Sequence, residues 1–230
     1  MTKAHLKRMA APKTWNVERK TTKFITRAKP GAHTIQLGIP LTVFFKEILK
    51  KVKTTKELKF ILHTQEILVD GKKRHDTSSM IGFMDVMSIP KTKENYRVLI
   101  NTKNKLYAQE INEKESKIKP CKLIRKTVLG KDKIQLSFTD GRTILVKKND
   151  YKTGDTLILE IPSQKIIEHI KLDKGCTIML YNGKHVGIVG KVDDIQGNTI
   201  NLTANKKKYE THKKYAFVIG QDKPTIKIAE

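Results

Sequence analysis

Acidic residues, aromatic residues, cysteines and long apolar runs are all scarce in this sequence. No apolar run approaches the roughly 20 residues that a helix needs to span a bilayer. The N-terminus also lacks the apolar stretch of a secretory signal peptide, so we expect neither membrane insertion nor export. The two cysteines, Cys121 and Cys176, lie in different parts of the chain and are expected to be reduced, buried thiols. Because aromatic residues make up only 6% of the chain, its cores must consist mainly of Ile, Leu and Val.

Motifs for metal binding, nucleotide binding and catalysis are missing as well. None of the seven scattered histidines has a cysteine or a second histidine at the spacing of a zinc site. Neither Gly-x-Ser-x-Gly nor His-Glu-x-x-His occurs. The stretch GKHVGIVGK at 183–191 fails as a phosphate loop, because His185 replaces a required glycine and Val192 a required Ser or Thr. We expect no catalytic residue, no metal and no cofactor.

Basic residues dominate what is present. Lys and Arg number 47 against 23 Asp and Glu, which gives a net charge of +24 and a pI near 9.9. A folded protein that repels itself this strongly is typical of chains that bind a polyanion. A membrane surface would require an amphipathic helix with bulky apolar residues opposite lysines, and no segment has that pattern. Nucleic acid is therefore the expected partner.

The first 40 residues form a basic arm, with nine basic residues and one acidic residue. The arm has too few periodic apolar positions to pack alone, so its order is expected to depend on a partner that supplies negative charge. Its apolar residues Leu6, Trp15, Phe24 and Ile25 are candidate anchors.

Two helices and a hairpin are predicted next. An apolar stripe from Leu41 to Val52 predicts a helix with Pro40 at its first position. A capping box at Thr54 and Glu57 predicts the start of a second helix. The lysines of both helices are expected to form one solvent-facing ridge suited to a phosphate backbone. They are Lys46, Lys50, Lys53, Lys56 and Lys59.

Short strands make up the rest of the expected structure. The Asp70-Gly71 pair predicts a hairpin whose end carries Lys72, Lys73 and Arg74. A period of two from about residue 95 to residue 172 predicts many short strands, with one short helix near 113–117, and so a small β-barrel.

A separate β unit is expected after residue 175. Its first strand ends in an Asn182-Gly183 turn, and Gly187 lets the following loop bend sharply. Lys184 and His185 would then be presented on that loop.

The order of these parts resembles one family. The segments KAHLKRMAAPKTW, GIPL, VDGKKRHD, GFMDVMSI, GKHVGIVGKV and FVIG, in this order, resemble the archaeal/eukaryotic-type small-subunit ribosomal protein four family. The resemblance implies an α+β, multidomain chain. Its expected parts are an N-terminal extension at 1–39, an alpha-L RNA-binding module at 40–92, a central small β-barrel at 93–172, an SH3-like KOW barrel at 173–220 and a tail at 221–230.

The same resemblance implies a structural role without catalysis or a cofactor. The partners would be small-subunit ribosomal RNA and neighbouring ribosomal proteins, with no membrane and no small-molecule substrate. The protein would be a cytoplasmic, ribosome-bound monomer within the ribosome. The sequence ends soon after FVIG, without the basic extension common in eukaryotic members, which favours an archaeal type.

The expected RNA-binding residues extend over the arm, the helix pair, the hairpin and the KOW loop. The arm contributes His5, Lys7, Arg8, Lys13, Trp15, Arg19, Lys20 and Arg27, and the later parts add the lysines of the helix pair, Lys72, Lys73, Arg74, Lys184 and His185. We expect these modules to recognise backbone shape, as is typical for double-stranded RNA. Few aromatics are available for extended stacking on single strands.

Two other functions remain open from the sequence. An RNA-modifying enzyme is one, because pseudouridine synthases also carry an alpha-L motif. The small β units leave no candidate acid in a cleft, which disfavours it. The other is a transcription or translation factor that carries a KOW domain and binds only transiently.

Overall fold

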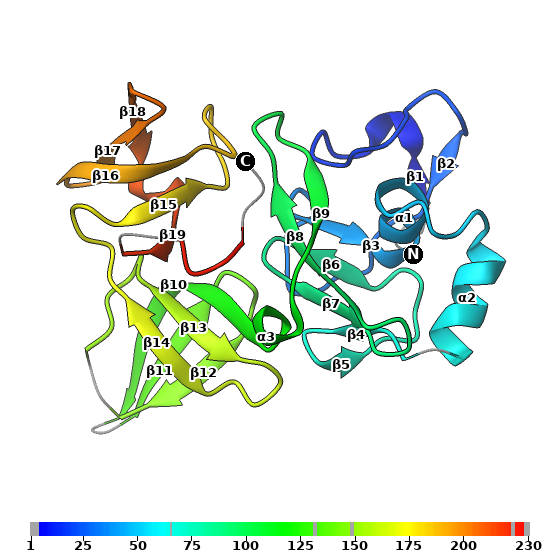
Figure 1. Cartoon of the computed structure of the whole chain (residues 1–230), viewed down its shortest axis with the longest axis horizontal. Helices are drawn as coiled ribbons and strands as arrows, with labels where there is room; N and C mark the ends of the chain where they lie inside the picture. Colours follow the sequence, from blue (N-terminus) through cyan, green and yellow to red (C-terminus); the bar gives the residue numbers. More distant parts are fainter. Residues whose placement is uncertain (1–4, 65, 131–132, 148–149, 222–223, 228–230) are drawn as a thin grey trace. The chain divides into compact units, whose positions relative to one another are not determined.

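The structure is a computed structural model that describes residues 5–64, 66–130, 133–147, 150–221 and 224–227. The first four residues of the expected arm and parts of the expected tail therefore lie outside the described residues. The chain divides into two compact units (Figure 1). Unit 1 comprises Met1–Leu99 and Asn104–Lys117, and unit 2 comprises Ile100–Lys103 and Ile118–Glu230. The fold is mostly β with few helices, and the expectation of a multidomain chain is confirmed.

Unit 1 contains three small sheets and short helices (Figure 1). The arm contributes β1 (Leu6–Lys7), the 3₁₀ turn η1 (Arg8–Ala10) and β2 (Phe24–Ile25), and β1 pairs with β2. The second sheet pairs β3 (Gly38–Pro40) with β6 (Met80–Gly82). The third has the strand order β5-β4-β7-β8-β9, from β5 (Lys72–Lys73), β4 (Leu68–Val69), β7 (Val86–Ile89), β8 (Glu94–Ile100) and β9 (Leu106–Glu110). Its helices are α1 (Leu41–Val43), the π-turn η2 (Phe44–Ile48), α2 (Thr55–Thr64) and α3 (Glu113–Ser116).

The first predicted helix is shorter than its apolar stripe. Pro40 ends strand β3 instead of opening the helix, and the helix becomes a π-turn after three residues. Lys50 then adopts a left-handed φ of 55°, and the N–H of Lys51 closes the turn on the carbonyl of Phe45 at 3.1 Å. Such a residue ends a helix. Val52 is still buried, but it packs from the connection and not from a helix.

The second helix and the hairpin agree with the sequence. Thr54 Oγ1 accepts a hydrogen bond from the N–H of Glu57 at 3.1 Å, and the Glu57 carboxylate accepts one from the N–H of Thr54 at 3.3 Å. This is the predicted capping box. Asp70 and Gly71 have φ values of 51° and 71°, which two-residue hairpin turns with positive φ require. The expected boundary between modules at residues 92 and 93 lies between β7 and β8, which pair in one sheet.

Unit 2 contains two five-stranded antiparallel sheets. The first has the order β12-β11-β10-β13-β14, from β10 (Ile118–Gly130), β11 (Lys133–Phe138), β12 (Thr143–Val146), β13 (Thr156–Glu160) and β14 (Ile166–Ile170). The second has the order β18-β17-β16-β15-β19, from β15 (Thr177–Leu180), β16 (Val189–Gln196), β17 (Thr199–Ala204), β18 (Lys207–His212) and β19 (Ala216–Gly220), with the 3₁₀ turn η3 (Lys213–Tyr215) before β19. The predicted short strands are confirmed.

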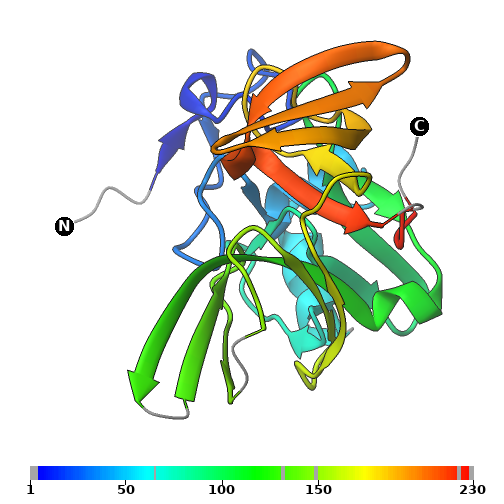
Figure 2. The same ribbon diagram turned by 90° about the vertical axis from the view of Figure 1, so that its left-hand side faces the viewer.

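The long strand β10 organises the first of these sheets (Figure 2). Its first half pairs with β13 and its second half with β11, and the register shifts between Leu123 and Arg125. Such a bulge bends a strand. The bend lets Leu123 of β10 share one core with Leu136 of β11 and Leu157 of β13.

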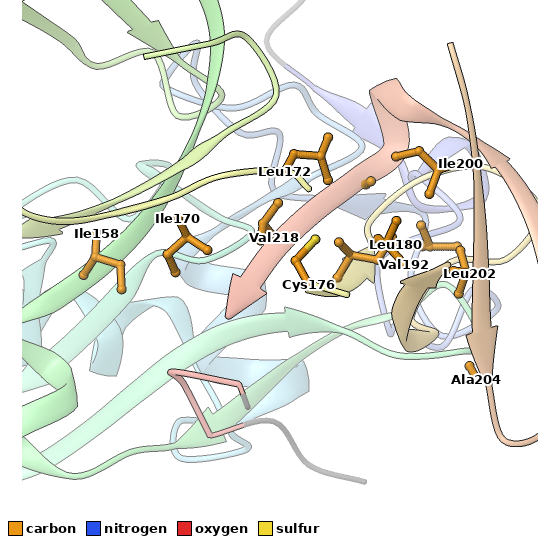
Figure 3. Close-up of a cluster of buried hydrophobic side chains, with 12 residues drawn as sticks. Ile158, Ile170, Leu172, Cys176, Leu180, Val192, Ile200, Leu202, Ala204 and Val218 are labelled. Atoms are coloured by element: carbon orange, nitrogen blue, oxygen red, sulfur yellow. The ribbon is translucent and has the colours of Figure 1, made fainter. Parts of the chain in front are cut away.

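A second core joins residues of both sheets of unit 2 (Figure 3). Ile158 and Ile170 come from the first sheet, and Ile178, Leu202 and Val218 come from the second. This packing makes the expected central and C-terminal β parts one compact unit. The chain between them contributes Cys176, which is a buried free thiol, as is Cys121 in β10. The prediction of two buried thiols is confirmed. No helix within the described residues is long and apolar enough to cross a membrane.

Candidate nucleic-acid interface

The arm is anchored in unit 1 through Trp15. The indole is completely buried, and its Nε1 donates hydrogen bonds to the carbonyls of Gly38 at 2.9 Å and Ile35 at 3.2 Å. The N–H of Leu106 in β9 donates to the carbonyl of Thr14 at 2.8 Å. Trp15 therefore lies in the core and has no surface to offer to RNA. We correct the expectation that it contacts RNA: it holds the arm in place.

Arg8 is also directed inward. The residue is buried, and its guanidinium pairs with Glu47 of the first helical segment. Its Nη1 donates to Thr22 Oγ1 at 3.2 Å, and its Nε donates to the carbonyl of Glu18. With these partners the guanidinium crosslinks the arm to the helix, so the expectation of an RNA contact at Arg8 is corrected in the same way.

Arg19 donates hydrogen bonds to the backbone of the arm itself. Its guanidinium donates to the carbonyls of Met9 at 3.0 Å, Ala11 at 2.9 Å and Pro12 at 3.0 Å. The carbonyls of Ala11 and Pro12 are partly buried and follow the short turn η1, and carbonyls removed from water need a partner. The planar fork of arginine suits this task. Arg19 is half-buried and remains a candidate RNA contact.

The other expected arm residues are exposed. They carry side chains on the outside of unit 1 and are His5, Lys7, Lys13, Lys20 and Arg27. These residues remain candidate phosphate contacts.

Helix α2 presents the clearest cationic surface of unit 1. Leu58 and Leu62 are completely buried, which fixes the opposite face toward solvent. Lys56 and Lys59 are exposed on the helix. Phe60 is also exposed, to 68%, between these lysines and the last turn. The helix satisfies its own backbone, so its lysines are not needed to hold carbonyls.

The expected ridge of lysines on two helices is only partly formed. The first helical segment ends at Ile48, so Lys50 and Lys53 lie in the connection and only Lys46 lies on the segment. The left-handed turn at Lys50 is the cause. Lys46 is half-buried and lines a groove beside the arm.

The hairpin brings charges next to α2. Lys72 is exposed, whereas Lys73 is paired with Glu66 at 3.2 Å and Arg74 is half-buried. The rings of His63 and His75 have centroids 6.4 Å apart, so the chain that follows β5 runs beside α2.

Lys29 joins this surface from the arm. It pairs with Asp76, and this hydrogen bond is the main cause that lowers the pKa of the Asp76 carboxyl. Nearby Lys59 lowers the same pKa further. The ion pair thus fixes the end of the arm beside the cationic face of α2.

In unit 2 the expected loop lies between β15 and β16. Residues 181–188 form it, so the connection is longer than the predicted Asn182-Gly183 turn. Gly187 has a φ of 79°, as the predicted sharp bend requires, and its N–H donates to the carbonyl of Leu180 at 2.7 Å. Lys184 is exposed at the tip. His185 is half-buried, with its ring centroid 5.0 Å from that of Tyr209.

Two lysines of β10 are buried and face away from any partner molecule. Lys119 pairs with Asp140 at 3.0 Å, and both are almost fully buried. Lys122 Nζ donates to carbonyls of the η3 turn and of Ala216, including that of Lys214 at 2.9 Å. Burial lowers the pKa of Lys122 to about 8. Lys119 stabilises the first sheet and Lys122 joins the two sheets of unit 2, and neither charge is available to RNA.

The chemistry of these surfaces is electrostatic. Within the described part of the chain, no cluster of three or more His, Cys, Asp or Glu residues could hold a metal ion. Exposed lysines on a rigid frame neutralise phosphates and displace their counterions.

Two family models match separate parts of the chain. The RS4NT domain matches residues 2–36, and the ribosomal family S4e matches residues 92–166. The small ribosomal subunit protein eS4 of Methanocella arvoryzae is 42% identical over 228 residues, covering 96% of this chain and 96% of that protein. The chain belongs to the ribosomal S4e family.

Other S4e relatives are similar over nearly their full length. The small ribosomal subunit protein eS4 of Methanosphaera stadtmanae is 40% identical, covering 97% of this chain and 95% of that protein. That of Methanocaldococcus jannaschii is 38% identical and covers 98% of each. The crystal structure of the 30S ribosomal protein S4e from Thermoplasma acidophilum has a TM-score of 0.71 at 28% identity, over 80% of this chain and 96% of that one.

The S4e surface contains residues that the sequence did not single out. Lys29 is one of them, because nothing local in the sequence signals its pairing with Asp76. Phe24 was predicted to be an anchor, yet it is 48% exposed, while its neighbour Ile25 is buried. Phe60 lies on the polar face of α2. An apolar residue on that face is a signal that the sequence already contains.

Proposed function

We propose that this S4e chain is a structural constituent of the small ribosomal subunit that binds and stabilises ribosomal RNA. Its identity of 42% to an eS4 protein over 96% of both chains carries this conclusion. The net charge of +24 supports it, because a chain with this excess needs a polyanion to neutralise it.

In this proposal the helix pair and hairpin at 40–92 act as an alpha-L module, and the β unit at 173–220 acts as an SH3-like KOW domain. Exposed lysines of both contact phosphates. The proposed contacts in unit 1 are His5, Lys7, Lys13, Lys20, Arg27, Lys46, Lys50, Lys53, Lys56, Lys59, Lys72, Lys73 and Arg74, and those in unit 2 are Lys184 and His185. Lys29 joins them from the arm.

The protein is further proposed to reside in the cytoplasm as a ribosome-bound monomer beside other ribosomal proteins, with no small-molecule substrate and no catalysis. Sedimentation tests residence. A tagged chain should remain with small subunits through a moderate salt wash, whereas a transient factor should leave the particle.

The enzyme alternative has its own test. Release of tritium from uridines of small-subunit RNA by the purified protein would support a pseudouridine synthase and count against a purely structural role. We expect no release above that of a protein-free control.

A further inference from the structure

One groove of unit 1 has a composition unlike that of a phosphate-binding ridge. It has a volume of about 480 Å³ and lies between the arm and the first helical segment. Volumes of about 300–1,000 Å³ are typical of ligand clefts. Phe24 lines it from the arm, Lys46 lines it from the helical segment, and Thr22 and Thr26 add hydroxyl groups.

The lining of the groove includes an ion pair between the arm and the helical segment. Arg8 and Glu47, which both line it, are paired with each other. Thr22 Oγ1 accepts from Arg8 at 3.2 Å and donates to the carbonyl of Phe24 at 3.1 Å, which fixes the wall of the arm. The lining is thus preformed, and its threonine hydroxyl groups and the Glu18 carboxylate offer hydrogen bonds to a base edge or a ribose.

The rim of the groove is aromatic and cationic. Phe24 is 48% exposed, and an apolar ring held in water is a favourable surface for stacking. The His5 ring meets it edge-on, with centroids 5.4 Å apart, and Lys23 Nζ lies 5.5 Å from its centroid. A base on the ring would therefore have cationic groups close to its own phosphate.

We propose that this groove binds one nucleotide of ribosomal RNA whose base is turned out of its helix, with Phe24 as the stacking platform and Lys46 on the phosphate. The proposal rests on the proposed function and deepens it. Sequence-specific RNA recognition targets such unstacked bases, whereas phosphate contacts carry no sequence information. The groove would thus give one sequence-dependent contact to a protein that otherwise recognises backbone shape.

The test uses the full chain and naked small-subunit ribosomal RNA. F24L keeps an apolar side chain but removes the π-face, and F24W keeps the π-face. Ile35→Leu is the control for a change at an exposed apolar side chain, because Ile35 is exposed in the same unit but does not line the groove. Affinity is measured across a salt series, and base-edge reactivity of the bound RNA is mapped at single-nucleotide resolution.

F24L should weaken binding about fivefold or more, as the loss of one stacked base predicts. The slope of affinity against salt should not change, since Phe24 carries no charge. One nucleotide protected by the wild type should become reactive in the F24L complex. F24W should keep both the affinity and the protection, and Ile35→Leu should resemble the wild type.

Three results would overturn the proposal. F24L could bind like the wild type with the same protected nucleotides, or F24W could fold with the wild-type urea midpoint and still lose the protection. F24L could also bind naked RNA normally but fail to enter small subunits, in which case the groove takes a protein segment. If the wild type itself does not bind the RNA, the proposed function fails instead, so the two failures are distinguishable.

Discussion

The arm and helix α2 have similar basic sequences but use their cations in opposite ways. In the arm, Arg8 and Arg19 turn inward to Glu47 and to backbone carbonyls. On α2, Lys56 and Lys59 stay exposed. The difference follows from the backbone. A helix satisfies its own carbonyls, whereas an irregular segment must find donors elsewhere, and arginine supplies several at once.

This comparison shows that the net charge of the chain overstates the number of cations that can contact RNA. Some of the 47 basic residues stabilise the fold, and only the remainder can neutralise phosphates. Such structural cations occur in the arm, as Arg8 and Arg19 do, and in strands, as Arg97, Lys119 and Lys122 do.

Removing the arm's anchor should have the largest effect. Trp15→Ala should lower the free energy of unfolding by about 3–5 kcal/mol, because it leaves a large cavity under the arm. Phe60→Ala, which removes an exposed aromatic from α2, should change it by less than about 0.5 kcal/mol. Urea unfolding followed by circular dichroism measures both changes in the free energy of unfolding. Equal changes in the two variants would contradict the difference between the arm and α2.

Exchanging arginine and lysine in each region gives a finer test of the difference between the arm and α2. Arg19→Lys should cost about 1–2 kcal/mol, since one ammonium cannot reach the three carbonyls that the fork holds. Lys59→Arg on α2 should be neutral within about 0.5 kcal/mol. Trp15 is the single tryptophan, so its fluorescence reports the unfolding of unit 1 in both variants. A neutral Arg19→Lys would show that the arm does not depend on the fork.

Lys122 extends the comparison to unit 2, where a buried lysine binds backbone carbonyls as Arg19 does in the arm. Burial lowers its pKa from 10.5 to about 8 in the folded chain. Between these values the unfolded chain binds more protons, so stability should rise with pH from about 8 to 10.5, by at most about 1.4 kcal/mol per pH unit.

The control for this prediction is Lys122→Met. Cys176, whose pKa burial raises to about 11, contributes the opposite trend at the upper end of the window. The difference between wild-type and Lys122→Met stability curves isolates the lysine, since the cysteine is common to both. A difference that does not depend on pH would show that Lys122 keeps its ordinary pKa.

The smallest effects on stability should come from α2. Lys56→Ala and Lys59→Ala should each leave the free energy of unfolding within about 0.5 kcal/mol of the wild type. Each should also reduce the salt slope of RNA binding by about one, as the loss of one phosphate contact predicts. Unchanged slopes in both variants would remove α2 from the RNA surface.

Local signals in the sequence were sufficient to predict many of the helices, strands and turns. The Thr54–Glu57 capping box and the Asp70-Gly71 hairpin depend on residues a few positions apart, and both are present. The first helix was predicted too long, because a left-handed Lys50 has no signature in an apolar stripe.

The inward-facing cations could not be predicted from the sequence. Arg8 meets Glu47 39 residues along the chain, and Lys122 meets carbonyls more than 90 residues away. Charge counts give such residues the same weight as exposed lysines, and the family resemblance placed Trp15 and Arg8 on the RNA surface together with Lys7 and Lys13. Only the tertiary structure separates the two groups.

The salt dependence of binding to small-subunit ribosomal RNA tests the central claim most directly. If exposed lysines neutralise 6–10 phosphates, affinity should fall about 10³- to 10⁵-fold between 50 and 200 mM salt. An affinity that stays constant over this range would contradict the account, because it would mean that the cationic surfaces do not contact the phosphate backbone.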